Sequence, residues 1–276
     1  MTLSRSDANR QLEDAGLRAK RALGQNFVVD ANTVRKIAHV AGVGASDHVV
    51  EIGAGLGSLT LALAETGARV LAVEVDDSLL PLLRGNVGHL DTVEVLHADA
   101  MALDWNTVLA GAAEWVLVAN LPYNVATPLV ADILDHVPQV RRMLVMVQKE
   151  VGERFCAATS TPAYGALSVK VAYHAKADVV GLVPPTVFLP RPNVDSALVQ
   201  IVRRDAPIAA DVDEASFFAL VKAGFAKRRK MLRGSLAGQV EPSHFEAAGI
   251  SPTARAEELD VHQWIALWRA REGRPS

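Results

Sequence analysis

The chain has 276 residues, a net charge of −3 and a pI near 6.2, and 50% of its residues are hydrophobic. This length suits one medium-sized domain with a smaller one, and the apolar share suffices for a buried core. We find no apolar run of the about 18 residues that a membrane helix needs, and we expect no secretion signal. The single cysteine, Cys156, excludes an intrachain disulfide, so we expect a cytoplasmic protein without a membrane partner.

Strand and helix patterns alternate through the first half of the chain. Residues 1–16 are polar and predict no ordered element, whereas 30–42 predict a helix with Asp30 as its N-cap. Short apolar runs predict strands over 48–53, 69–76, 93–100, 115–122 and 142–149, and helical spacing predicts helices over 58–67, 77–88 and 127–137. This alternation predicts a doubly wound α/β sheet.

The second half of the chain departs from this alternation. A helix is predicted over 165–175, and strands over 178–185 and 195–204 follow without an obvious helix between them. We therefore expect an antiparallel ending to a parallel sheet. The pattern after 208 is helical, and Pro207 interrupts it, so we divide the chain into domains at 1–207 and 208–276.

A glycine-rich turn, Gly53-Ala54-Gly55-Leu56-Gly57, follows the first of these α/β strands and precedes a helix. Glycine lets the backbone turn sharply and approach a ligand, and this turn is where open α/β sheets bind nucleotide-like cofactors. The GxGxG spacing differs from that of dinucleotide sites. Taken alone, the turn fits a ligand site and a merely tight connection equally well.

Two acids at later strand ends sharpen this interpretation. Glu74 ends the second strand, where a carboxylate can accept both ribose hydroxyls, and Asp99 ends the third, where it can accept a hydrogen bond from an adenine amine. The glycine turn and the two acids, in this order, predict an adenosine-containing cofactor. They leave open the choice between a nicotinamide dinucleotide and S-adenosylmethionine.

The tetrad Asn120-Leu121-Pro122-Tyr123 follows the fourth strand, whose end borders the same crevice. An adenine amine is a poor nucleophile because its lone pair is delocalised into the ring. The Asn120 side-chain carbonyl and the Leu121 backbone carbonyl can accept its N–H hydrogen bonds, which localises that lone pair. Pro122 stiffens the turn, and Tyr123 offers a ring on which a splayed-out base can stack. The tetrad predicts methylation of an adenine amine and does not distinguish RNA from DNA.

Several longer segments carry a wider resemblance, among them KRALGQNFVVD (20–30), VVEIGAGLGSLTLALAE (49–65), NLPYNVATPLV (120–130), VPPTVFLPRPNVDSALV (183–199) and FAKRRKMLRGSL (225–236). From about Lys20 to Trp268 the chain resembles the ribosomal RNA adenine N6,N6-dimethyltransferases, above all the bacterial enzymes that act on two adjacent adenines near the 3′ end of small-subunit (16S) rRNA. The resemblance implies a Rossmann-like class I methyltransferase sheet with a smaller C-terminal helical domain, and S-adenosyl-L-methionine as methyl donor.

The resemblance also implies roles for single residues. Asn26 and Val28 would contact the methionine end of the cofactor; the family commonly has leucine at the position of Val28, and a backbone contact survives that change. Phe188 would stack on the second face of the target base. The remaining assignments are Gly53 and Gly55 lining the cofactor, Glu74 on its ribose, Asp99 on its adenine, Asn120 beside both cofactor and base, and Leu121, Pro122 and Tyr123 on the base.

A basic segment near the C-terminus predicts the nucleic-acid contact. It contains Lys222, Lys227, Arg228, Arg229, Lys230 and Arg233 and no acid. Such a segment is typical either of a solvated helix face or of RNA backbone contact, and the resemblance favours RNA. The scattered histidines and single cysteine predict no metal site. Trp264 and Trp268 are expected in the core of the smaller domain.

Alternative functions remain at this stage. A large-subunit rRNA adenine methyltransferase shares the cofactor site and the NLPY-type tetrad. A non-catalytic RNA-binding ribosome-assembly factor would share the fold, although the intact Glu74, Asp99 and Asn120 argue against lost catalysis. A dinucleotide dehydrogenase fits less well because its phosphate fingerprint is missing. We expect the small ribosomal subunit as partner and a monomeric protein.

Overall fold

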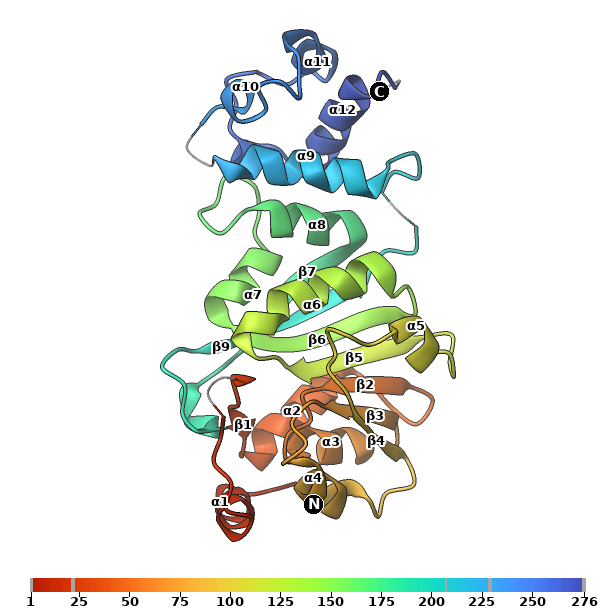
Figure 1. Ribbon diagram of the computed structural model, residues 1–276, viewed down its shortest axis with the longest axis vertical. Coiled ribbons are helices and arrows are strands. Elements are labelled where there is room, and N and C mark those ends of the chain that lie inside the picture. The colour runs from red at the N-terminus through yellow and green to blue at the C-terminus, as the bar shows by residue number, and fades with distance from the viewer. Residues whose placement is uncertain (1, 21–22, 207, 228–229, 275–276) are drawn as a thin grey trace. The chain divides into compact units, whose positions relative to one another are not determined.

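The computed structural model describes residues 2–20, 23–206, 208–227 and 230–274, without the side chains of residues 123 and 124. The chain forms two compact units (Figure 1). The larger unit comprises Met1–Gly152 and Asp178–Arg203, and the smaller comprises Glu153–Ala177 and Arg204–Ser276. None of the described helices is long and apolar enough to cross a membrane.

A seven-stranded sheet in the order β4-β3-β2-β5-β6-β9-β7 forms the centre of the larger unit. Its strands are β2 (His48–Ile52), β3 (Arg69–Glu74), β4 (Val93–His97), β5 (Trp115–Asn120), β6 (Val140–Gln148), β7 (Ala175–Val183) and β9 (Ser196–Arg203). The pairs from β4 to β6 are parallel and β9 is antiparallel to β6, which confirms the predicted sheet and its antiparallel ending. The strand order reverses between β2 and β5, which is where such sheets bind ligands.

Helices cover this sheet because its central strands are apolar along nearly their whole length. The helices from the N-terminus to the end of β6 and just beyond it are α1 (Arg5–Asp14), α2 (Ala31–Ala41), α3 (Ser58–Ala64), α4 (Leu80–Val87), α5 (Trp105–Val108), α6 (Tyr123–His136) and α7 (Lys149–Phe155). Helices α2 and α3 pack together, with Ile37 and Leu63 in one core cluster with Val118 of β5. Helix α6 packs against β6, and in Figure 1 it lies in front of the sheet.

The N-terminal region is ordered, contrary to the prediction for residues 1–16. Ser4 caps α1 through a capping box with Asp7, and the first-turn carboxylate accepts from the Ser4 amide. Ala8 and Leu12, four residues apart, are buried in a core cluster with Leu83 of α4. Two buried apolar side chains are too few to give a recognisable helical period, so the sequence pattern missed this helix.

A second, two-stranded sheet joins distant parts of the larger unit. Strand β1 (Phe27–Val28) pairs antiparallel with β8 (Phe188–Leu189), which follows a short 3₁₀ turn, η2 (Pro185–Val187). The Arg5 guanidinium donates to the carbonyls of Thr186 and Phe188 at 2.6 and 3.0 Å. The N-terminal segment is thereby fixed to the loop before β9.

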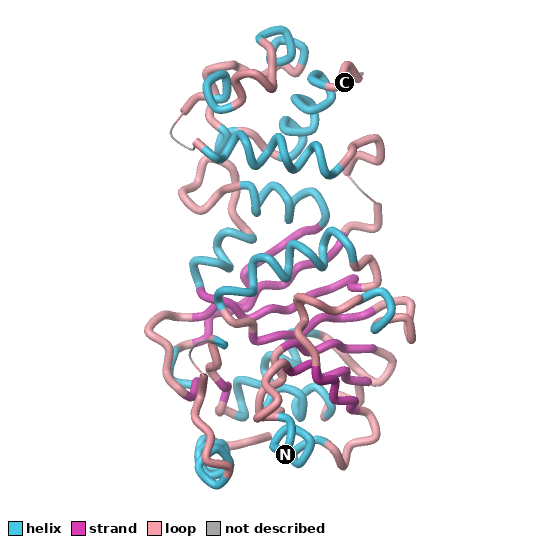
Figure 2. Tube along the Cα trace, viewed as in Figure 1, coloured by secondary structure: helices cyan, strands magenta, loops and turns pink. Residues whose placement is uncertain are grey.

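The smaller unit consists mainly of helices and loops (Figure 2). These are α8 (Ala166–His174), α9 (Glu214–Ala226), α10 (Leu232–Ser235), α11 (Pro242–Ala247), η3 (Ala256–Glu258) and α12 (Val261–Arg271). Trp264 and Trp268 are 0% and 1% exposed in its core, as predicted. Val169 and Tyr173 of α8 share this core with Phe217. The division predicted at 207 and 208 therefore differs from the observed one, in which residues 153–177 also belong to the smaller unit.

Candidate active site

Two adjoining cavities open at the carboxyl ends of the central parallel strands. They share Leu23, Gly53, Val75 and Pro122. The first cavity is lined by the glycine turn, Glu74, Asn120 and the N-terminal segment, and the second by Asp99 and apolar side chains. Both lie beside the point where the strand order reverses between β2 and β5.

The glycine turn requires glycine at Gly53, Gly55 and Gly57, whose φ angles are 75°, 58° and 86°. A Cβ atom on Gly55 would lie 2.9 Å from Cδ1 of Phe27, so a side chain would also displace that ring. Gly53 lines both cavities. The turn thus brings its backbone to the cavity and at the same time packs against β1.

Glu74 lies buried at the end of β3 and lines the first cavity. Its Oε2 accepts from the Gly55 amide at 2.7 Å, and its Oε1 accepts from the Asp76 amide at 2.8 Å. A carboxylate has about four acceptor positions, so two backbone donors leave room for hydroxyl donors from the cavity. This geometry is suitable for the predicted ribose contact.

Asp99 lies at the exposed edge of the second cavity, just beyond β4. Its Oδ1 accepts from the Met101 amide at 2.9 Å. Val73, Val75 and Leu129 provide apolar walls to the same cavity. A flat base between such walls would find an acceptor at the rim, as predicted for the cofactor adenine.

Asn120 has a defined amide orientation. Its Nδ2 donates to the backbone carbonyl of Asn26 at 2.9 Å, and because a carbonyl can only accept, the nitrogen must face Asn26. The Oδ1 atom is therefore the acceptor that Asn120 offers. The Leu121 amide donates to the Met146 carbonyl at 3.0 Å, and Pro122 is the N-cap of α6. The Tyr123 side chain lies outside the described residues.

Asn26, Val28 and Phe188 are the remaining residues of the predicted site, and the structure places them differently. Asn26 and Val28, which are predicted to contact the methionine end of the cofactor, line the first cavity. Phe188 does not: it pairs with Val28 across the small sheet, and its side chain is 1% exposed in the cluster that contains Val34. The prediction that Phe188 presents a stacking face is wrong for this structure, because the β1–β8 pairing directs the residue into the core.

Sequence reasoning assigned no role to Glu51, which is 2% exposed in β2 and lines the first cavity. Burial, aided by the charge of Glu74, raises the pKa of Glu51 to about 8. Among the described residues, Glu51 Oε2 and the Oγ atom of Ser58 lack a hydrogen-bond partner, and both side chains line this cavity. Unsatisfied buried polar atoms are costly, so the cavity suits a ligand with a polar, charged end such as an amino acid.

A second feature missed by sequence reasoning is Asp76, which is buried two residues after β3. Burial opposes its ionisation, but hydrogen bonds from Lys20, Ser78 and Gln25 outweigh that effect and lower the pKa of Asp76 to about 2. The sequence shows that residues 74–77 are acidic. It does not show that Lys20 and Gln25, some fifty residues earlier in the chain, donate hydrogen bonds to Asp76.

The basic segment lies in the smaller unit, at the end of α9 and in the residues that follow. Lys222, Lys227, Lys230 and Arg233 are exposed, whereas Arg228 and Arg229 lie outside the described residues. Arg255, which pairs with Met231 in an isolated antiparallel bridge, is also exposed. It adds a positive charge that the sequence pattern did not group with the segment.

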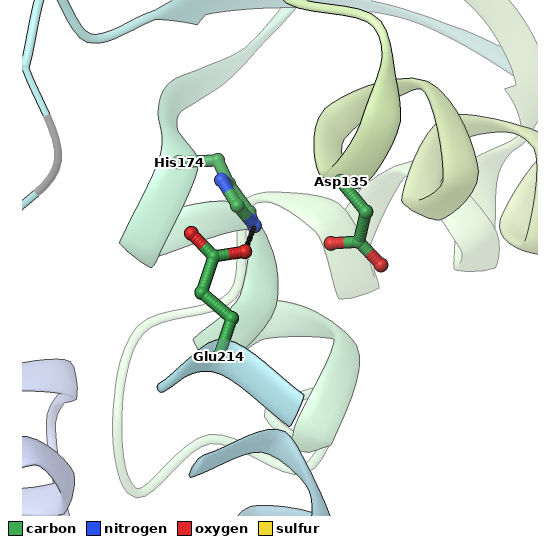
Figure 3. A group of neighbouring side chains, drawn as sticks. All are labelled: Asp135, His174 and Glu214. Carbon is green, nitrogen blue, oxygen red and sulfur yellow. Dashed lines mark ion pairs between the residues drawn. The ribbon is translucent and has the colours of Figure 1, made fainter. Parts of the chain in front are cut away.

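A histidine–carboxylate pair also lies in the smaller unit. Figure 3 shows this pair, His174 and Glu214, whose Nε2 and Oε2 atoms are 3.7 Å apart. The His174 ring also packs against Tyr173 and Phe218. We interpret the pair as part of the packing at the start of α9 and assign no metal to it.

Comparisons with known proteins agree with this geometry. The family model for ribosomal RNA adenine dimethylases matches residues 16–270. A ribosomal RNA small subunit methyltransferase A from Cutibacterium acnes is 48% identical over 273 residues, covering 94% of this chain and 91% of that protein. The protein of that name from Geobacillus kaustophilus is 40% identical over 272 residues, covering 94% and 93%.

Two solved structures share the fold. A dimethyladenosine transferase from Plasmodium falciparum superposes with a TM-score of 0.74 at 22% identity, covering 89% of this chain and 98% of that one. The 23S rRNA methyltransferase ErmE superposes with a TM-score of 0.69 at 24% identity, covering 90% and 100%. At this level of identity the likeness concerns the fold alone.

Proposed function

This chain belongs to the ribosomal RNA adenine dimethylase family, and from that premise we propose that it dimethylates the N6 amines of two adjacent adenines near the 3′ end of small-subunit (16S) rRNA. S-adenosyl-L-methionine is the methyl donor of this family of enzymes. The observation that carries the proposal is the orientation of Asn120, which lines a cavity suited to that cofactor and whose Nδ2 bond to the Asn26 carbonyl leaves Oδ1 as the acceptor.

Different residues of the cavity would contact different parts of the cofactor. Glu74 would accept the ribose hydroxyls, Asp99 would accept from the adenine amine, and Asn26 and Val28 would contact the methionine end. Gly53 and Gly55 would line the bound molecule, because glycine leaves the backbone accessible there. When bound, the cofactor supplies an electrophilic methyl group on a sulfonium. The uncharged amide of Asn120 suits a site next to that cation.

The tetrad would prepare the target amine. Asn120 Oδ1 and the Leu121 carbonyl accept its two N–H hydrogen bonds, which favours a pyramidal nitrogen with a localised lone pair. Pro122, as N-cap of α6, fixes the peptide that carries the second acceptor. Tyr123 would support the flipped base on one face. The amine needs no prior deprotonation, because its proton can leave after the new N–C bond has formed.

The smaller unit would provide the RNA contact. Lys222, Lys227, Lys230 and Arg233 are exposed and can neutralise backbone phosphates, and we assign Arg228 and Arg229 to the same contact. We propose that the larger unit serves as the methyltransferase domain and the smaller unit as the RNA-binding domain. The partner is the small ribosomal subunit, and the protein acts as a cytoplasmic monomer.

The test uses small subunits that lack the modification. Incubation with labelled S-adenosylmethionine should place label on two adjacent adenines of 16S rRNA, read by nuclease digestion and by primer extension. The variant Asn120→Ala, assayed beside it, should lose transfer while still binding S-adenosylhomocysteine. Label in large-subunit rRNA would identify the alternative acceptor, and stable subunit binding without any label would identify a non-catalytic assembly factor; both results contradict the proposal.

A further inference from the structure

Residues 23–28 form one wall of the first cavity, and together with Lys20 they are here called the strap. Each residue from Leu23 to Val28 lines that cavity. The strap also provides the carbonyl of Asn26 that orients Asn120. What holds the strap in place therefore affects both the cofactor cavity and the tetrad.

Asp76 is the anchor of the strap. Its Oδ1 accepts from the Lys20 ammonium at 2.7 Å and from the Ser78 hydroxyl at 2.6 Å, and its Oδ2 accepts from the Gln25 amide at 2.7 Å. The Asp76 side chain is 1% exposed, whereas that of Lys20 is 45% exposed. A surface ion pair alone contributes little, but a buried carboxylate that loses a donor carries a large penalty.

Gln25 closes the arrangement into a ring. Its Nε2 donates to Asp76, and its Oε1 accepts from the Lys20 backbone amide at 2.7 Å. The backbone N–H of Gln25 in turn donates to the backbone carbonyl of Lys20 at 3.3 Å. The side-chain amide of Gln25 acts in the ring both as a donor, to Asp76, and as an acceptor, from Lys20. Neither a hydrocarbon nor a carboxylate side chain can do both, so neither can replace it unaided.

Asp76 also contacts the predicted ribose site. Its backbone amide donates to Glu74 Oε1, while Glu74 Oε2 accepts from Gly55. The Phe27 ring of the strap occupies the space beside Gly55. Asp76 thus bonds both to the strap and to Glu74, and the glycine turn in turn contacts Glu74 and the strap.

We propose that Asp76 is a positioning residue that, through Gln25, holds the strap against the cofactor cavity and so sets the affinity for the cofactor. The proposal rests on the assignment of this cavity to S-adenosylmethionine. It gives Gln25 and Asp76 a role for which neither needs to touch the cofactor.

The first variant is Asp76→Asn, which keeps the shape of the side chain. The asparagine oxygen can serve Lys20 and Ser78, which leaves its NH₂ group facing the NH₂ group of Gln25. Two opposed donors should loosen the strap, and we expect the affinity for S-adenosylhomocysteine to fall about tenfold by calorimetry. The KM for S-adenosylmethionine should rise by a similar factor, while the KM for RNA stays within about twofold.

The decisive variant exchanges the two functional groups. Gln25→Glu alone places two carboxylates against each other and should also weaken binding about tenfold. Asp76→Asn combined with Gln25→Glu restores a donor opposite an acceptor with the same net charge, and should bind within about threefold of wild type. A role confined to global stability would leave the affinity of the folded single variants equal to that of wild type.

The control variant is Asp211→Asn, which removes an exposed carboxylate that pairs with Arg269 in the smaller unit. Its affinity for S-adenosylhomocysteine should equal that of wild type. If Asp76→Asn binds as wild type does, or if the double variant binds no better than the weaker single variant, the proposal is overturned. Should Asp76→Asn fail to fold, Gln25→Leu, which removes both side-chain bonds of the ring, must weaken binding; unchanged binding overturns the proposal.

Binding of S-adenosylhomocysteine is measured without RNA. The role of Asp76 and the assignment of 16S rRNA as substrate can therefore be refuted independently. Wild-type protein that binds S-adenosylhomocysteine but leaves 16S rRNA unlabelled refutes the substrate assignment alone. Loss of rescue in the double variant, with labelling intact in the wild type, refutes the role of Asp76 alone.

Discussion

Replacing Glu51 with glutamine should remove a pH-dependent loss of stability. Burial raises the pKa of Glu51 to about 8 in the folded chain, from 4.5 as its ordinary value. Between these pH values the folded chain holds a proton that the unfolded chain has released. Stability relative to Glu51→Gln is therefore greatest below pH 4.5 and is lost as the pH rises towards about 8.

The size of the effect follows from the linkage. Each pH unit within this window changes the free energy of unfolding by up to about 1.4 kcal/mol, so from pH 5.5 to 7.5 the difference between the two proteins should shift by about 2–3 kcal/mol. Water that enters the cavity beside Glu51 would reduce this value, because it lowers the cost of the buried charge.

Urea unfolding at several pH values, without cofactor, measures this difference directly. Titrations common to both proteins cancel in the comparison. Glu94→Gln removes an exposed carboxylate from β4 and serves as the control for the loss of charge. A difference between wild type and Glu51→Gln that stays constant from pH 5.5 to 7.5 would show that Glu51 ionises normally, and the argument from its burial would fail.

Three further outcomes are expected. Asn120→Ala should lower the rate of methyl transfer at saturating S-adenosylmethionine by about 10²-fold or more; transfer at the wild-type rate would contradict the role of the amide. Arg203→Met should lower the free energy of unfolding by about 2–4 kcal/mol, read by urea unfolding, because the guanidinium donates to the carbonyls of Ile133, Leu134, Val137 and Val140 around the end of α6. Changing Lys227 and Lys230 to glutamine should weaken RNA binding and reduce its salt slope by up to about two, and an unchanged slope would mark these residues as merely solvated.

The strands and the cofactor loop could be predicted because their signals are local. Apolar runs bounded by glycine identify β2, and a strand that ends in an acid places Glu74 at the carboxyl edge of the sheet. Each of these requires only a few neighbouring residues. Parallel strands then bring their ends together, so residues predicted one strand at a time meet at one cavity.

The parts that could not be predicted depend on pairings between distant segments. The resemblance assigned Phe188 to the target base, and only its pairing with Val28 shows that it is buried. Asp76 gave no sign of its partners because Lys20 and Gln25 precede it by more than fifty residues. The sequence marks such groups as polar, but only the structure shows what each of them contacts.

The same long-range pairing gives a physical reason for asparagine at position 120. The Asn26 carbonyl needs a donor, and Asn120 Nδ2 provides it while leaving Oδ1 for the target amine. An aspartate in this place would set a carboxylate oxygen against the Asn26 carbonyl oxygen, and the repulsion would push the strap and the tetrad apart. An aspartate would thus lose the contact that orients the acceptor, even though it offers more acceptor capacity. Asn120 is matched to the strap as well as to the adenine amine, so the cofactor wall and the chemistry are fixed by one hydrogen bond.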